Sequence, residues 1–343
     1  MRKLLTLTAV AALVAVSVSF AGTAKALEVK LFRSQTTLVG TVTVEDDGTD
    51  FTVTINTTGG FILLVSHVAI GQTLTDLPQN RSNNPKVGHF PSTETSSALD
   101  EEDTHVHTIA LANVLGGAAT ASDQVTIAVH AKVLDLASAT TTTIVSDVTT
   151  MITATNTGTT TPFAAVIQTA DPWSALLTGT NKDLLTAGNA AGAEFIWESD
   201  GPNDFNVEED VSFKRTFTID GIPLLGSVLH ITCDNEYDPV ALNGTPIGSD
   251  FGATAGFDEQ EWRSVETYDD ADGVSAALQQ GSNMLTIDAL NFGDRFPFAM
   301  CVYLLDAENS DDVRSAWAAV DDSGDETFEG RNWATWFLYT TSP

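Results

Sequence analysis

Cysteine and basic side chains are scarce in this sequence of 343 residues. The two cysteines, Cys233 and Cys301, allow at most one internal disulfide, so stability has to come mainly from packing. Lys and Arg number 15 against 46 Asp and Glu, which gives a formal net charge of −31. This balance excludes nucleic acids and anionic membrane surfaces as expected partners, because both bind a positively charged face.

A long apolar run is also missing after the first 26 residues, so no membrane span is expected. Those residues carry Arg2 and Lys3, then a largely apolar stretch, and they end in Ala24-Lys25-Ala26. This order predicts a signal peptide over residues 1–26 with an A-x-A cleavage site. The expected location is therefore extracellular or at the cell surface after Sec-type export.

The common catalytic motifs are absent: there is no Gly-x-Ser-x-Gly elbow, no His-Glu-x-x-His pair and no phosphate-binding loop. Among 46 acidic residues, no pair can be singled out as the two carboxylates of a glycoside hydrolase. We therefore expect a protein without enzymatic activity.

Alternation of apolar and polar residues with a period of two is the dominant pattern. Residues 38–45 and 50–56 alternate on either side of Asp47-Gly48, which predicts a β-hairpin. Further strands are expected in the first half at 61–70, 105–111 and 124–134. A second β-rich block predicts strands at 212–219, 227–234, 240–242, 262–268, 283–290 and 298–305. The fold class is thus all-β, with two β-sandwich domains.

Segments of the second block carry a resemblance to a known family. They read FIWESD at 195–200, SFKRTFTIDGIPL at 212–224, LHITCDNEYDPVALNGTPIG at 229–248, WRSVETYD at 262–269 and LQQGSNMLTIDALNFG at 278–293. Their order resembles galactose-binding-like jelly-roll modules of exported bacterial and archaeal proteins, and more distantly the sugar-binding domains of β-glycosidases and rhamnosidases. One departure is the stretch Asn235 to Pro239, which is one residue longer than in these relatives and implies a bulge or an edge position.

The first block resembles another recurrent domain of exported proteins. LVGTVTVEDDGTDFTVTINTTGGFILLVSHVAIG at 38–71, NNPKVGHFP at 83–91 and VTIAVHAKV at 125–133 carry this resemblance, and the family's closing segment stands here at 315–339 as SAWAAVDDSGDETFEGRNWATWFLY. The resemblance implies a jelly roll inserted into a split outer sandwich, in a family with no assigned activity. The expected division is given by residues 27–158 and 309–343 for the outer sandwich, 159–189 for a linker and 190–308 for the jelly roll.

Three histidines in expected strands of the outer domain, His67, His107 and His130, could converge as metal ligands. The alternative is a hydrogen-bonded histidine network in or beside a core. His105 shares the alternation of His107 but stands at the start of its strand, where we expect it to meet water.

Two acidic loops beside glycine turns offer the hard oxygen ligands that calcium takes, although neither has EF-hand spacing. Their candidate ligands are Asp269, Asp270 and Asp272 in one loop and Asp321, Asp322 and Asp325 in the other. No other cofactor is expected.

A sugar site, if the jelly roll has one, is expected in its loops. Tyr237 or Trp262 would supply a flat apolar face, and Asp234, Asn235 and Asp258 would bond hydroxyl groups. The alternatives are core packing for the aromatic rings and turn stabilisation for Asp234 and Asn235.

Cys233 and Cys301 are expected in opposing sheets with both sulfurs facing one core, as either a disulfide or two buried thiols. The function expected from the sequence is a non-catalytic, secreted or cell-surface structural or adhesive protein that could bind carbohydrate. Its partners would be an extracellular glycan or other surface proteins. A secreted carbohydrate-active enzyme or its accessory module, and a calcium-dependent lectin or adhesin, are the alternatives.

Overall fold

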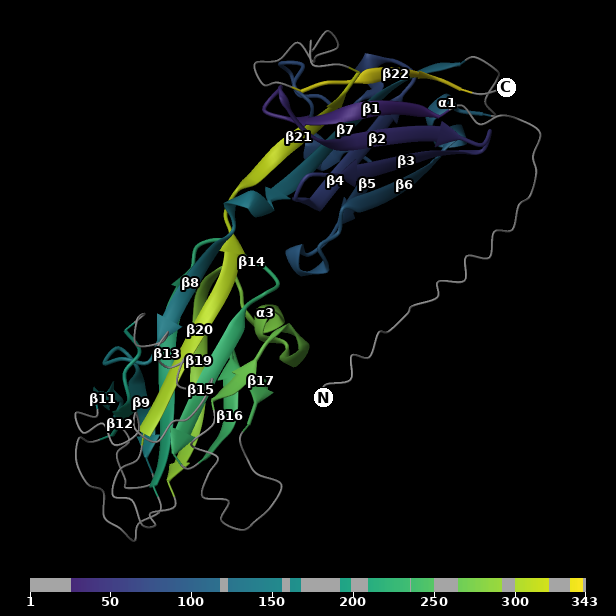
Figure 1. Ribbon diagram of the computed structural model, residues 1–343. Helices are drawn as coiled ribbons and strands as arrows, with labels where there is room; N and C mark the ends of the chain where they lie inside the picture. The colour runs from purple at the N-terminus through teal and green to yellow at the C-terminus, as the bar shows by residue number, and fades with distance from the viewer. Residues whose placement is uncertain are drawn as a thin grey trace, which may run out of the picture.

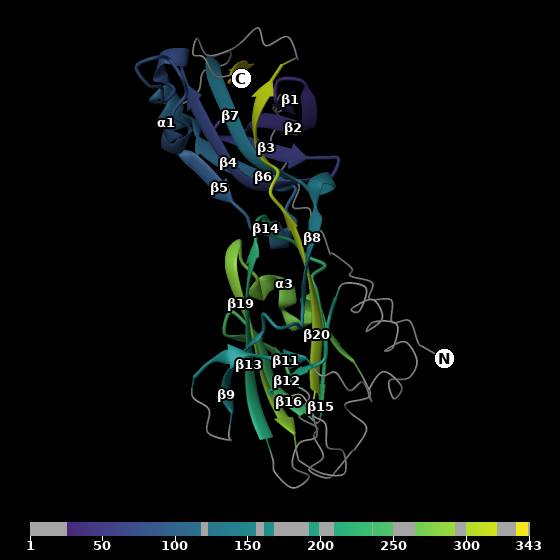
Figure 2. The same ribbon diagram turned by 90° about the vertical axis from the view of Figure 1, so that its left-hand side faces the viewer.

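The structure is a computed structural model in which the chain forms two β-rich bodies placed end to end (Figures 1 and 2). It describes residues 26–117, 123–155, 161–167, 192–198, 209–234, 236–249, 265–291, 300–320 and 334–341. We call residues 26–138 together with 311–341 the outer domain, and residues 139–310 the inserted sandwich. The all-β fold class is confirmed, with one body built of two facing sheets and the other of a single curled sheet. The predicted signal peptide, apart from Ala26, lies outside the described residues.

The outer domain is one 9-stranded antiparallel sheet that curls so that its two halves face each other. Its strand order is β5-β4-β7-β21-β1-β2-β3-β6, with β22 also paired to β7. The strands are β1 (Leu27–Arg33), β2 (Thr37–Asp46), β3 (Asp50–Thr57), β4 (Phe61–Gly71), β5 (Ser92–Thr95), β6 (Thr104–Ala110), β7 (Gln124–Asp135), β21 (Val313–Ala319) and β22 (Phe337–Thr340). Short helices are η1 (Leu74–Asp76), η2 (Val87–His89), η3 (Ala98–Asp100), α1 (Leu111–Leu115) and η4 (Leu136–Ser138).

The predicted hairpin joins β2 and β3, which pair from Gly40 with Thr57 to Asp46 with Phe51. Asp47 starts its turn by accepting the backbone N–H groups of Thr49 and Asp50 at 2.8 Å each, and Gly48 supplies the positive φ of 81°. Alternation then points Val53 and its apolar neighbours on these strands inward, where they are fully buried in one core.

The inserted sandwich has two antiparallel sheets that face each other across a second core. One sheet has the order β10-β9-β13-β19-β16-β17, and the other has the order β11-β12-β20-β15-β18, with β8 and β14 also paired to β20. The first sheet comprises β9 (Met151–Thr155), β10 (Phe163–Ala164), β13 (Glu209–Ile219), β16 (Glu236–Leu242), β17 (Thr245–Gly248) and β19 (Gly281–Asn291). The second comprises β8 (Thr140–Val145), β11 (Val166–Ile167), β12 (Ile196–Trp197), β14 (Ile222–Pro223), β15 (Val228–Asp234), β18 (Glu266–Tyr268) and β20 (Met300–Ser310); η6 (Asp270–Asp272) and α3 (Val274–Ala277) lie between β18 and β19.

Strand pairing moves the boundary between the two bodies. We expected residues up to 158 to belong to the outer domain, but β8 pairs with β20 and β9 pairs with β13, both inside the inserted sandwich. Residues 163–167, expected in the linker, also form strands of this sandwich, and the rest of that linker lies largely outside the described residues. The chain therefore leaves the outer domain near Ser138 and returns near Asp311.

The two chain crossings between the bodies lie side by side and are bonded to each other. Arg33 binds Asp135 at 2.8 Å and approaches Asp312 at 3.6 Å, so one guanidinium joins the outgoing and returning segments. The hydroxyls of Ser138 and Ser310 are 2.8 Å apart, which adds a second bond between the segments. These bonds fix where the insertion is attached.

An apolar contact completes the junction. Leu224, which follows β14 in the inserted sandwich, is buried in one cluster with Ile62, Leu64 and Leu134 of the outer domain. Burial of a leucine contributes on the order of 2 kcal/mol. The junction therefore has its own small core and is more than a tether.

Candidate functional sites

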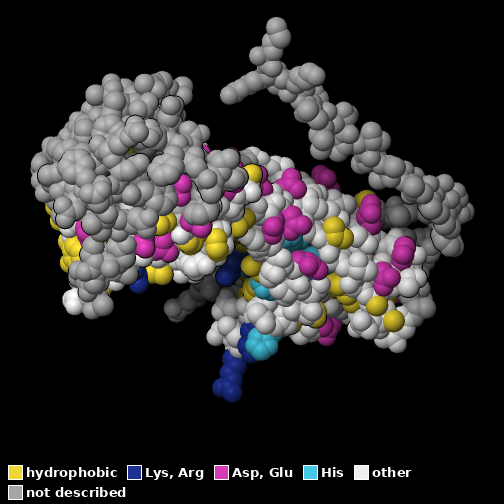
Figure 3. Space-filling model, turned by 90° about the horizontal axis from the view of Figure 1, so that it is seen from below, with side chains coloured by type: hydrophobic (Ala, Val, Ile, Leu, Met, Phe, Trp, Pro, Cys, Tyr) yellow, Lys and Arg dark blue, Asp and Glu magenta, His cyan; other side chains and the backbone are white. Residues whose placement is uncertain are grey.

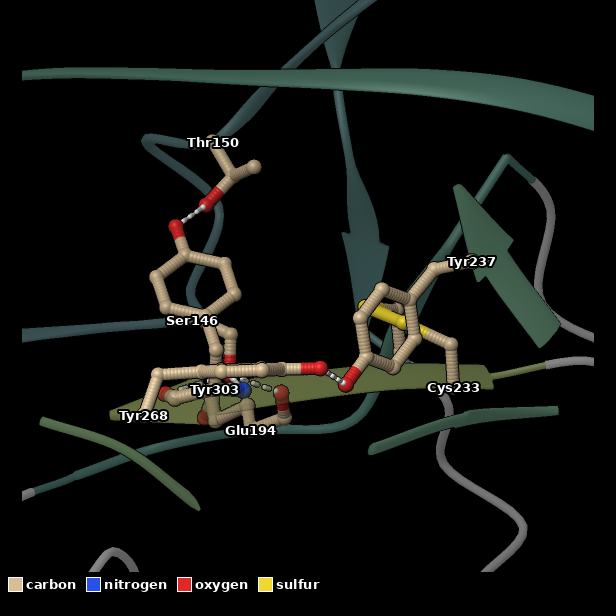
Figure 4. Close-up of a disulfide and its surroundings, with 8 residues drawn as sticks. Ser146, Thr150, Glu194, Cys233, Tyr237, Tyr268 and Tyr303 are labelled. Carbon is tan, nitrogen blue, oxygen red and sulfur yellow. Dashed lines mark hydrogen bonds between the residues drawn. A yellow bond between two sulfur atoms is a disulfide. The ribbon is translucent and has the colours of Figure 1, made fainter. Parts of the chain in front are cut away.

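The expected sugar-binding stretch, Asn235 to Pro239, contains a residue of the core. Tyr237 is fully buried in β16, and its hydroxyl lies 2.8 Å from that of Tyr268 (Figure 4). A ring without an exposed face cannot stack on a sugar, so of the two alternatives for Tyr237 the structure has core packing and not the flat platform. The expected bulge is present as a register shift between Tyr237 and Val240.

Of the remaining sugar-site candidates, only Asp234 belongs to the described residues. Asp234 is the last residue of β15, where its backbone pairs with Met300. Trp262, Asn235 and Asp258 lie outside the described residues.

The ring of Tyr268 lies where a side chain at residue 248 would be, so it needs a glycine there. A Cβ atom at residue 248 would come within 2.0 Å of the Tyr268 ring. The absence of a side chain at Gly248 thus positions Tyr268, and the hydroxyl bond between the two tyrosines follows from that position.

Cys233 and Cys301 form a disulfide (Figure 4). They lie on β15 and β20, which are neighbouring strands of one sheet, and the two residues are direct register partners. Our expectation of opposing sheets was therefore wrong, and of the two alternatives for the sulfurs the structure has the disulfide.

Both cysteines are fully buried, so the disulfide is expected to persist in the purified protein. Alkylation in denaturant without reductant should leave the intact mass unchanged, whereas prior reduction should add two alkyl groups. Two alkylated cysteines without reductant would show that the sulfurs are free thiols.

The first acidic loop uses its carboxylates to hold its own backbone. Asp269 accepts the N–H of Ala271 at 2.8 Å, Asp272 accepts the N–H of Asp269 at 3.0 Å, and Asp270 accepts the N–H of Gly226 at 2.7 Å. Asp269 and Asp272 form a capping box at the start of η6, in which the side chain of each accepts the backbone N–H of the other. Asp321, Asp322 and Asp325 of the second loop lie outside the described residues.

The histidines of the outer domain divide between two faces of the sheet. Ser66 and His67 are neighbours on β4 and so point to opposite sides. His105 and His107 lie with Ser66 on the inner face, whereas His67 and His130 lie on the outer face. The three predicted metal ligands therefore do not converge. Within the described part of the chain, no group of three or more His, Cys, Asp or Glu is arranged to hold a metal ion.

A hydrogen-bonded histidine network joins the two edge strands of the curled sheet. β5 and β6 end the strand order, and no backbone ladder between them occurs among the described strands. Side chains join them instead: Ser66 to His105 at 2.7 Å, Ser66 to His107 at 2.7 Å, Ser92 to His107 at 2.8 Å and Ser96 to His105 at 3.1 Å. We call these five residues the seam network.

The donor and acceptor of each bond in the seam network can be assigned by starting from Ser96. The Ser96 hydroxyl donates to the carbonyl oxygen of Leu63, so its oxygen accepts Nε2–H of His105. Nδ1 of His105 then accepts from Ser66, whose oxygen accepts Nε2–H of His107. Nδ1 of His107 accepts from the serine on β5. Both imidazoles are thus neutral, and every ring nitrogen has a partner.

Sequence reasoning named the histidines and the possibility of such a network but missed the serines. Ser66 alternates with the apolar residues of β4, which was a signal for an inward-facing hydroxyl. His105, expected to meet water, is 4% exposed because β5 covers the start of β6.

Burial keeps the seam histidines uncharged. It lowers the pKa of His107 to about 4, with further lowering from His105 and His67. Burial also lowers the pKa of His105, although the carboxylates of Glu102 and Glu94 oppose that shift. An imidazolium at His107 could not accept the hydroxyl of Ser92, so protonation breaks a bond of the network.

The seam network predicts a loss of stability in mild acid. Because the pKa of folded His107 lies below the 6.5 of the unfolded chain, the unfolded chain takes up the proton first as the pH falls. The free energy of unfolding should therefore decline between about pH 6.5 and 4, by up to roughly 1.4 kcal/mol per pH unit for each such histidine. Denaturant melts of the wild type and His107→Asn at several pH values measure this slope.

The His107→Asn slope should be shallower, while the exposed His89 provides a control in His89→Asn, whose slope should match the wild type. Protonation of carboxylates contributes equally to all three proteins. Equal slopes in the wild type and His107→Asn would contradict the assignment.

No helix in the described ranges is long and apolar enough to cross a bilayer.

No family model and no curated protein matches the sequence. Among solved structures, a crystal structure of Streptomyces avermitilis α-L-rhamnosidase complexed with L-rhamnose aligns with 93% of this chain at 11% identity, with a TM-score of 0.28. This chain covers 26% of that protein, and so low a TM-score carries no conclusion about function.

Proposed function

We propose that this protein is a non-catalytic, exported structural or adhesive protein in which the outer domain holds the inserted sandwich in a fixed position for contact with an extracellular partner. The junction carries this proposal. Arg33 bonds both chain crossings, and the buried Leu224 packs into the outer domain, so the two bodies form one elongated unit. A fixed spacing between two bodies serves presentation or assembly.

The contacts made by these charged and polar side chains agree with a structural role. Carboxylates of the first acidic loop cap backbone, the seam histidines join two strands, and Asp135 and Asp312 bind Arg33. The predicted signal peptide and the disulfide agree with an oxidising compartment outside the cell.

Carbohydrate is the partner we propose for the inserted sandwich. The support is its sequence resemblance to galactose-binding-like modules and the position of its strand ends. β15 and β19 end, and β16 and β20 begin, at the end of the inserted sandwich that is remote from the outer domain (Figure 1). Ligand-binding residues are disproportionately found in the segments that connect strand ends.

The proposal of a structural role is tested by substituting each of two neighbouring leucines at the junction. Leu224→Asp places a charge in the junction core, whereas Leu225→Asp changes a side chain that is 38% exposed. Small-angle scattering should show a single elongated shape for the wild type and Leu225→Asp, and a broad range of shapes for Leu224→Asp. A broad range in the wild type would remove the proposal of fixed spacing.

The proposal of carbohydrate binding is tested on a glycan array, with the full mature protein in the presence of calcium and in the presence of a chelator. Binding in both supports a calcium-independent glycan-binding module. Binding only with calcium identifies a calcium-dependent lectin, and release of reducing sugar identifies an enzyme. No binding at millimolar glycan leaves the structural role alone.

A further inference from the structure

Two imidazoles meet on the outer face of the outer domain. His67 on β4 and His130 on β7 are direct register partners, and their ring centroids are 5.6 Å apart. The Nδ1 atoms of both rings are buried and have no hydrogen-bond partner among the described residues. Buried ring nitrogens without a partner are uncommon in folded proteins, where such groups generally bond to a protein atom, a water or an ion.

We propose that Nδ1 of His67 and Nδ1 of His130 together bind one divalent transition-metal ion, with water completing its coordination. Imidazole nitrogen is a usual ligand of Zn²⁺, Cu²⁺ and Ni²⁺. Two imidazoles bound at about 2.0–2.1 Å with a tetrahedral angle at the metal would place their ring centroids about 5 Å apart. The observed 5.6 Å is close to that separation.

The ring of His130 is already fixed in place. Its Nε2 lies 3.1 Å from the hydroxyl of Ser315, and Trp317 packs edge-on against it with ring centroids 4.9 Å apart. Phe90 packs in turn on Trp317. When Nε2–H donates to Ser315, the lone pair of the ring is on Nδ1, which is the atom the metal needs. Metal-binding histidines commonly donate their other nitrogen to an oxygen in this way.

The local charges allow neutral ligands and an entering cation. Burial lowers the pKa of both histidines, for His130 to about 3, so both rings are uncharged at neutral pH. Lys132 lowers both pKa values further and opposes a bound cation, but its side chain is exposed to solvent, which screens it. Acidic side chains are spread over the surface seen in Figure 3 and attract cations to the protein. His67 is half-buried, so its side chain reaches solvent beside the pair, although its Nδ1 atom is covered.

The test uses the full mature protein after treatment with a chelator. Titration with Zn²⁺ at pH 7.5 should show one site of higher affinity than the background of surface carboxylates. Cu²⁺ at one equivalent should give an electron paramagnetic resonance spectrum with nitrogen splitting from two imidazoles. His67→Ala should bind at least 10-fold more weakly and lose the two-nitrogen signature, and the exposed His89→Ala should behave as the wild type.

His67→Gln repeats the test with a side chain of similar size, and a thermal melt without metal checks that each variant is folded. Ser315→Ala should weaken binding while keeping both nitrogens, since it only frees the His130 ring. Binding unchanged in His67→Ala, a Cu²⁺ spectrum with oxygen ligands alone, or no binding up to millimolar Zn²⁺ would each overturn the proposal.

Discussion

A chain that ends at residue 312 is expected to lose the outer domain as a folded unit. The truncation removes β21 and β22, and β21 lies in the middle of the sheet between β7 and β1. Without it, the backbone groups of both neighbours lose a ladder partner, and the core loses the fully buried Ala316, Ala318, Phe337 and Tyr339. The combined loss exceeds the roughly 5–15 kcal/mol that stabilises a typical domain.

Hydrogen exchange reports the outcome, because the inserted sandwich retains all its strands and would still give a thermal transition. Amides of residues 38–57, in β2 and β3, should be protected in the full chain and unprotected in the truncated one. A chain ending at Thr341 keeps β22 and should match the full chain. Full protection of residues 38–57 after truncation at 312 would show that the outer domain folds without β21.

Replacing Tyr237 with alanine is expected to cost about 3–5 kcal/mol of unfolding free energy, as for other large buried aromatic residues. The ring is fully buried in the core of the inserted sandwich, beside the disulfide (Figure 4). Tyr237→Phe keeps the ring and removes only the hydroxyl bond to Tyr268, so it should cost about 1 kcal/mol. Chemical denaturation of the three proteins gives both differences.

The same variants separate packing from recognition. If the wild type binds a glycan, Tyr237→Phe should bind it equally well, because the ring is not on the surface. If Tyr237→Ala keeps the stability of the wild type but loses glycan binding, Tyr237 is a ligand-binding residue and the packing role is wrong.

Turns and alternation were readable from the sequence because they are local. Asp47-Gly48 predicted a tight turn, and the turn is present, with a φ of 81° at Gly48. The same alternation identified the inward residues of β2 and β3.

Long-range pairing was not readable, and this explains the two main errors. Residues 140–145 were assigned to the outer sandwich, but their partner, β20, is more than 150 residues away in the sequence. Cys233 shows the same alternation whether its partner strand is beside it or across the core, so only the strand order could decide the sheet of Cys301. The seam network likewise depends on how far the outer sheet curls, which no local pattern determines.

The paired crossings at Ser138 and Ser310 have a mechanical consequence. β1 and β22 both belong to the outer domain, and the inserted sandwich enters and leaves that domain at one place. Tension applied between residues 27 and 341 therefore runs through the ladders of β1, β21, β7 and β22 and bypasses the inserted sandwich. A ligand held by the sandwich would be undisturbed until the outer sheet itself tore, and the Cys233–Cys301 disulfide would limit extension of the sandwich after that.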